Sequence, residues 1–260
     1  MFAWLTERRR KRLQAQPFPA GWDAIIGRNV PVAHRLDMRQ AQRLRDLVQV
    51  FIAEKSWEGC GGLELTEEMQ VTVAAHACLL VLERDLDLYK DVDSILLYPT
   101  TIVAEPRKPY LFETVRTPVG HARALLGEAM LHGPVVLAWD AVLASAEPDA
   151  AGNVVIHELA HKLDMADGSV DGTPPLPSRR ELDEWARVCS AAYRELCTRV
   201  ELGIPTVIDA YGATNEAEFF AVATETFFLR PRELRLDQPA LYHLLARFYR
   251  YAPEPFAGFN

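Results

Sequence analysis

The segment that most constrains this chain of 260 residues is 154–164, where two histidines and a glutamate lie among apolar residues. Their order is His157-Glu158-x-x-His161. On a helix this spacing puts the two histidines on one face, about 6 Å apart along the axis. Imidazole and carboxylate groups are costly inside a buried helix unless they are paired or bind a metal. The segment therefore predicts a buried helix with a polar site on one face.

The two histidines are candidate ligands of a single zinc ion, because imidazole nitrogens bind zinc at about 2.0–2.1 Å. Glu158 directly follows the first histidine, so its side chain is expected beside the metal rather than on it. That position suits a general base acting on a water molecule that the metal activates. We therefore predict zinc at His157 and His161, with Glu158 as a catalytic residue.

A catalytic zinc site needs a third protein ligand, and three places in the sequence compete for this role. Asp167 lies six residues after His161, as in metzincin-type sites, although an aspartate stands where those sites have a turn glycine. The acidic helix expected over 215–225 offers Glu218 and Glu225 on one face, and the pattern leaves these two tied. The remaining candidates are the distant histidines His121, His132 and His243.

Hydrophobic periodicity favours an α+β fold that is mainly helical. Helices are expected over 39–55, 66–83, 153–165, 178–202, 216–229 and 238–251. Short apolar segments punctuated by proline and glycine predict a small mixed sheet from strands at 94–99, 101–104, 110–117 and 134–139. Residues 1–35 are expected to form a short helix and then a loop. The zincin-like helix should pack against a helical C-terminal half.

The chain shows no linker, so we expect a single domain over 1–260. Within it we expect an N-terminal lobe of helices and sheet over about 1–139. A helical lobe that binds zinc is expected over about 140–260.

Composition excludes several classes of protein. Lys and Arg number 28 against 36 Asp and Glu, and the resulting net charge of −8 argues against direct binding of nucleic acid. The longest nearly apolar stretch, 71–82, is about half of the ~20 residues that a membrane span needs. The basic run 8–12 is not followed by an apolar core, so no signal peptide is expected. Four scattered cysteines without a CxxC pair favour the reducing cytoplasm.

Three segments together resemble the Mlc titration factor A (MtfA) family of bacterial zinc metallopeptidases. They are HELAHKLDM at 157–165, IDAY at 208–211 and EAEFFAV at 216–222. The resemblance implies that Glu218, rather than Glu225 or Asp167, is the third zinc ligand. It also implies a core similar to the protease domain of anthrax lethal factor.

In that protease a tyrosine lies seven residues before the ligand glutamate, as Tyr211 precedes Glu218 here. The resemblance therefore implies a catalytic role for Tyr211. Its phenol would donate a hydrogen bond to the oxyanion that forms when a peptide bond is attacked.

The resemblance implies a cytoplasmic, zinc-dependent peptidase that acts like an aminopeptidase on short peptides. It further implies that the protein binds and inactivates a sugar-responsive repressor of the Mlc type, which would connect it to regulation of the phosphotransferase system. The alternative is a non-enzymatic or latent protein that has a zinc site and sequesters a regulator. Glu158 argues against this alternative, because a structural zinc site needs no base and prefers a closed set of ligands.

Overall fold

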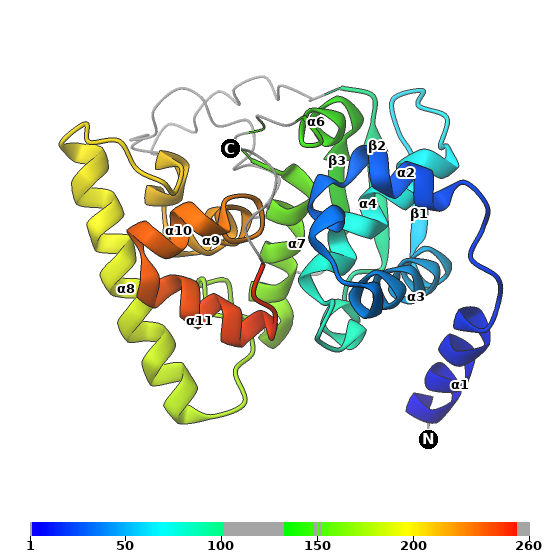
Figure 1. Ribbon diagram of the computed structural model, residues 1–260, viewed down its shortest axis with the longest axis horizontal. Coiled ribbons are helices and arrows are strands. Elements are labelled where there is room, and N and C mark those ends of the chain that lie inside the picture. Colours follow the sequence, from blue (N-terminus) through cyan, green and yellow to red (C-terminus); the bar gives the residue numbers. More distant parts are fainter. Residues whose placement is uncertain (1, 101–132, 148–149, 151, 254–260) are drawn as a thin grey trace, which may run out of the picture.

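The structure, a computed structural model, describes residues 2–100, 133–147, 150 and 152–253. It has the α+β fold expected from the sequence, with many helices and one small sheet. The helix that carries the two histidines, α7 (Val154–Asp164), runs through the middle of the molecule (Figure 1). The sheet and the N-terminal helices lie on one side of α7, and the C-terminal helices lie on the other. The two groups of elements therefore both contribute to the surroundings of the histidines.

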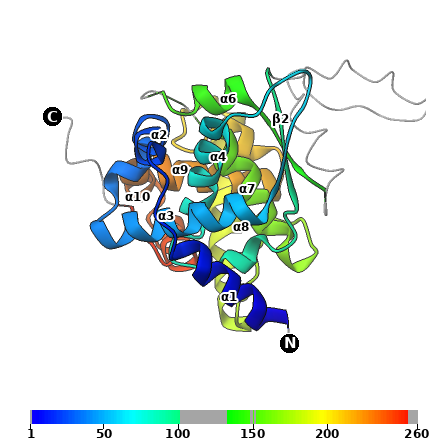
Figure 2. The ribbon, with the colours of Figure 1, turned by 90° about the vertical axis from the view of Figure 1, so that its right-hand side faces the viewer.

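The N-terminal helices are α1 (Phe2–Gln14), α2 (Trp22–Asn29), α3 (Met38–Glu54) and α4 (Glu67–Leu80). The carboxylate of Asp37 caps α3, and the hydroxyl of Thr66 caps α4. Helix α4 is buried on nearly all sides because α2, α3 and α7 contact it. Helix α1 lies at the edge of the molecule, far from α7 (Figure 2).

Helix α2 corrects the loop that the sequence led us to expect after the first helix. Trp22 and Ile26 are one turn apart, and their burial gives this short helix an apolar face. A 3-10 helix at Pro31–Arg35 follows it. Eight residues are too few for the helical period to stand out in a sequence.

The three described strands pair in parallel in the order β1-β2-β3, where the sequence suggested a mixed sheet. Trp57 lies opposite Ile95, and Ile95 lies opposite Val135. Helix α4 lies between β1 and β2 in the chain, and a crossover of this kind returns the chain in the same direction. The strands expected at 101–104 and 110–117 lie outside the described residues. The bounds are β1 (Ser56–Gly59), β2 (Ser94–Tyr98) and β3 (Val135–Ala138).

The C-terminal half is helical, as expected. Its α-helices after β3 are α6 (Trp139–Ala144), α7, α8 (Arg179–Glu201), α9 (Glu216–Leu229), α10 (Pro231–Asp237) and α11 (Pro239–Tyr249). Helix α9 packs against α7, which confirms the expected contact between the histidine-bearing helix and the C-terminal helices. No helix in the described part of the chain has the length and apolar character required to cross a membrane.

Trp185 fastens the loop that follows α7 to the C-terminal helices. Its indole N–H donates to the carbonyl of Gly172 at 3.0 Å, and its ring packs edge-on against Phe220 and Phe248. Gly172 has a φ of +76°, and a Cβ there would lie 2.3 Å from the carbonyl oxygen of Glu216. Only glycine therefore fits where this loop meets the start of α9.

We expect Trp185→Ala to lower the free energy of unfolding by about 3–5 kcal/mol, because it leaves a large cavity between three helices. Trp185→Phe should cost less, since it keeps an aromatic ring there and loses mainly the hydrogen bond to Gly172. Urea unfolding followed by circular dichroism measures both changes. A loss below about 1 kcal/mol in Trp185→Ala would contradict this account of the packing.

Candidate metal site

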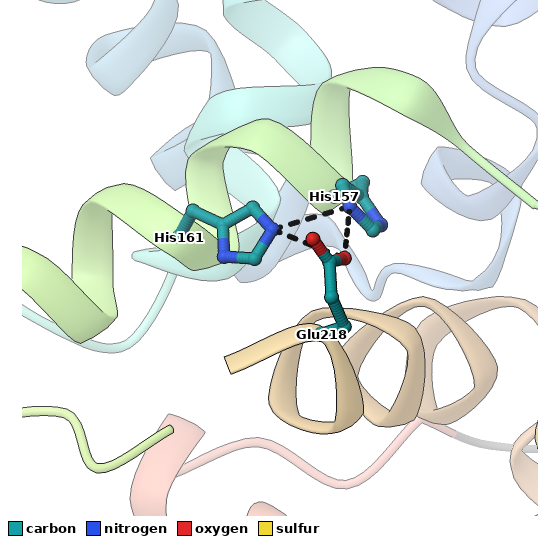
Figure 3. Close-up of side chains that lie close together, drawn as sticks. All are labelled: His157, His161 and Glu218. Atoms are coloured by element: carbon teal, nitrogen blue, oxygen red, sulfur yellow. Dashed lines mark hydrogen bonds and ion pairs between the residues drawn. The ribbon is translucent and has the colours of Figure 1, made fainter. Parts of the chain in front are cut away.

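Helix α7 presents its two histidines because its other faces are apolar and buried. Asn153 begins the helix, and its side-chain oxygen accepts the amide of Ile156 at 2.9 Å. The apolar residues Val155, Ile156, Leu159 and Ala160 have no exposed surface. His157 and His161 are themselves buried, one turn apart on the side of α7 that faces α9 (Figure 3).

Glu218 reaches the same place from the first turn of α9. Asn215 caps this helix by accepting the amide of Glu218 at 2.9 Å, which fixes where the turn begins. Glu218 Oε2 lies 3.1 Å from Nε2 of His157 and 3.4 Å from Nε2 of His161 (Figure 3). The two Nε2 atoms are 3.2 Å apart. Three potential ligand atoms therefore form a nearly equilateral triangle.

The size of this triangle fits a metal ion of the zinc type. Ligands bound at about 2.0–2.1 Å in a tetrahedron lie about 3.3 Å from one another, which is close to the three distances measured here. Two imidazole nitrogens and one carboxylate oxygen are also a donor set that occurs in catalytic zinc sites. Within the described ranges, His157, His161 and Glu218 form the group of potential ligands that converges in this way.

The electrostatics of the site also favour a cation. Burial alone would lower the pKa of His157, but the carboxylates of Glu218 and Glu225 outweigh it and raise the pKa to about 10. Burial would raise the pKa of Glu218, but the imidazoles of His157 and His161 hold it well below its usual value. The carboxylates of Glu218 and Glu225 therefore stabilise positive charge around His157, and a divalent metal ion at the three ligand atoms would supply such charge.

The structure distinguishes Glu218 from Glu225, which the sequence pattern left as equal candidates for the third metal ligand. Oε1 of Glu225 accepts a hydrogen bond from Nδ1 of His157 at 2.7 Å. Its other oxygen accepts the backbone amide of Asn153. Glu225 thus lies against the ring nitrogen of His157 that points away from Glu218, so it does not belong to the triangle of ligand atoms.

The structure does not bring Asp167 to the site. Asp167 is exposed beyond α7, and its carboxylate accepts the amide and the hydroxyl of Ser169. Asp164 is buried and accepts the amide of Gly172 at 3.0 Å, so it fastens the loop after α7. His243 is exposed on α11. His121 and His132 lie outside the described residues.

His76, a buried polar residue of α4, is a hydrogen-bonded core residue. Its Nε2–H donates to the carbonyl of Asn29 at 3.1 Å, and its Nδ1 accepts from the side-chain amide of Asn153 at 3.2 Å. Burial lowers the pKa of His76 to about 4, so the ring is neutral near pH 7.

Two further residues lie beside the triangle. Glu158, next to His157 on α7, is half-buried. Tyr211 lies in a 3-10 helix (Ala210–Ala213) just before α9, and its ring centroid is 6.1 Å from that of His157. The carboxylate of Asp209 accepts the amide of Tyr211 at 2.8 Å and so fixes this turn. Tyr211 therefore packs near the ligand atoms, as its position before Glu218 suggested.

A His-Glu-x-x-His helix packed against a second helix that supplies a glutamate is the metal-site arrangement of a metallopeptidase-like protein. The chain belongs to the family described as glucose-regulated metallo-peptidase M90, whose model matches residues 4–250. This membership implies a metal cofactor.

Relatives match over nearly the whole chain. Protein slr2042 of Synechocystis sp. is 38% identical over 257 residues, which cover 96% of this chain and 90% of the relative. The Mlc titration factor A of Serratia proteamaculans is 36% identical over 245 residues, which cover 92% of this chain and 90% of the relative. The protein of the same name from Klebsiella pneumoniae is 33% identical over 236 residues, which cover 89% of this chain and 86% of the relative.

Proposed function

We propose that the chain is a zinc-dependent peptidase in which His157, His161 and Glu218 hold the zinc. The observation that carries this proposal is the triangle of two imidazole nitrogens and one carboxylate oxygen, with sides of 3.1, 3.2 and 3.4 Å. When bound, zinc would polarise a peptide carbonyl and lower the pKa of a water molecule at the site. The remaining tasks are to transfer the protons of the attacking water and to stabilise the negative charge on the oxyanion, and these fall to side chains of the protein.

Glu158 is the general base in this proposal. It is half-buried and lies next to a ligand without being one, so its carboxylate is available to take a proton from the attacking water. The same carboxylic acid then returns the proton to the leaving amine as the peptide bond breaks. One residue thus serves both halves of the reaction, and it ends in the ionisation state in which it began.

Tyr211 is the oxyanion donor in this proposal, which the packing of its ring near His157 supports. We expect Tyr211→Phe to lower kcat by about 100-fold and to change KM little, because the hydrogen bond strengthens only as the oxyanion forms. Steady-state peptide hydrolysis measures both constants. A Tyr211→Phe protein with the wild-type kcat would exclude this role.

The substrates we propose are short peptides, cleaved from the amino end, and the support is the resemblance to the MtfA family. The test compares an amino-acid p-nitroanilide with its N-acetylated form. We expect hydrolysis of the free form only, its loss after treatment with a chelator, and its return on addition of zinc. Hydrolysis that survives complete removal of metal would contradict the proposed chemistry.

We further propose that the protein binds a transcriptional repressor of the Mlc type in the cytoplasm. Two relatives that carry the name Mlc titration factor A support this second function. Co-elution of the purified chain with such a repressor in size-exclusion chromatography tests it. Repeating the experiment with Glu158→Gln distinguishes binding from hydrolysis, since the variant should still bind. Separate elution of both proteins at micromolar concentration would contradict the proposal.

A further inference from the structure

We propose that Glu225 is a positioning residue, which holds the ring of His157 so that its Nε2 points at the metal. This inference rests on the proposed function, because it takes His157 to be a metal ligand. Glu225 is 8% exposed and lies on α9, two helical turns beyond Glu218. Its Oε1 accepts from Nδ1 of His157 at 2.7 Å. A carboxylate in this position fixes both the tautomer and the orientation of a metal-binding histidine.

Glu225 is itself held in place by the start of α7. Its second carboxylate oxygen accepts the backbone amide of Asn153. Gly152 leaves the space that this contact needs, because a Cβ there would lie 2.5 Å from Oε2 of Glu225. The carboxylate therefore bridges the N-terminus of α7 and the histidine one turn further along the same helix.

Asn153 is fixed in turn by the core of the N-terminal half. Its side-chain oxygen caps α7, and its side-chain amide donates to Nδ1 of His76 at 3.2 Å. His76 donates from its other nitrogen to the carbonyl of Asn29 at 3.1 Å. A continuous series of buried hydrogen bonds thus runs from α2 through α4 and the start of α7 to Glu225 and His157. This series would resist rotation of the His157 ring.

The two histidines differ in this respect. Within the described part of the chain, the buried Nδ1 of His161 has no hydrogen-bond partner. The protein therefore fixes His157 directly, whereas His161 is oriented by its packing and by whatever binds at its Nε2. Because Nδ1–H of His157 donates a hydrogen bond to Glu225, Nδ1 keeps its proton and Nε2 is the nitrogen that binds a metal ion.

Glu225→Gln tests the role of the carboxylate with little change in shape. A glutamate accepts two N–H bonds, one at each oxygen, whereas a glutamine can accept at one position only and presents N–H at the other. One of the bonds to His157 and Asn153 must therefore be lost. We expect zinc affinity, measured by competition with a chromophoric chelator, to fall about 10-fold to 100-fold. Glu216→Gln, the same change at an exposed site on α9, should leave it unaltered.

If Glu225→Gln does not fold, the role of Glu225 can still be tested with a second variant and with an NMR spectrum of the wild type. Gly152→Ala retains the carboxylate but crowds it, so it should also weaken zinc binding. In the zinc-loaded wild type, the NMR spectrum of the imidazole nitrogens should show a slowly exchanging proton on Nδ1 of His157.

The outcomes separate this inference from the proposed function. Zinc affinity within threefold of the wild type in folded Glu225→Gln, or a His157 ring without a protected Nδ1 proton, would overturn the role of Glu225 alone. A wild-type chain that takes up no zinc in the same competition would instead contradict the proposed function. Weaker zinc binding in Glu225→Gln, with unchanged zinc binding in Glu216→Gln, supports both the role of Glu225 and the proposed function.

Discussion

Glu158→Gln should hydrolyse peptides about 10²–10⁴-fold more slowly than the wild type while binding zinc equally well. The amide of glutamine cannot accept a proton from water or return one to the leaving amine. Nearly all of the loss should therefore appear in kcat. Because Glu158 is half-buried and is not one of the three converging ligand residues, the change should spare both the fold and the metal.

The experiment needs metal analysis and kinetics on the same preparation. Glu233→Gln, an identical change at an exposed position of α10, controls for the loss of one negative charge and should keep full activity. Glu158→Gln protein that contains zinc and keeps the wild-type kcat would remove Glu158 from the mechanism. Loss of zinc together with activity would show instead that Glu158 helps to hold the metal.

Glu218→Ala should abolish stoichiometric zinc binding. It removes one of three ligand atoms and the carboxylate that contacts both imidazoles, at 3.1 and 3.4 Å. The matched variant Glu216→Ala, two residues away on the exposed side of α9, should keep one zinc per chain. The zinc content of each variant is measured after dialysis by mass spectrometry of the metal. One zinc per chain in dialysed Glu218→Ala would show that another residue supplies the third ligand.

The helices around the site could be predicted because their local signals are strong. Asn153 and Thr66 cap the helices that follow them, and the apolar pattern between caps and breakers gives the bounds of α4, α7 and α9 within a few residues. The short elements β1 and α10 escaped prediction. Their four and seven residues offer too little sequence for either periodicity to emerge.

The sequence pattern alone could not predict which glutamate of α9 contacts the Nε2 atoms of the two histidines. Residues 218 and 225 are two turns apart, so helical periodicity puts both on the face that meets α7. The angle and register at which α9 packs on α7 decide that one carboxylate reaches the Nε2 atoms and the other reaches Nδ1 of His157. The family resemblance implied Glu218 as a ligand, whereas the contact of Glu225 came only from the structure. Gly152, which leaves room for Glu225, likewise carries no signal in the sequence.

The ligands of zinc in the purified wild-type chain can be measured by X-ray absorption spectroscopy. We expect one zinc per chain, bound by two imidazole nitrogens at about 2.0–2.1 Å and by oxygen, with no sulfur. The absence of sulfur is informative because the chain contains four cysteines. A shell of sulfur at about 2.3 Å, or a protein that does not bind zinc, would contradict the metal site on which the proposed peptidase depends.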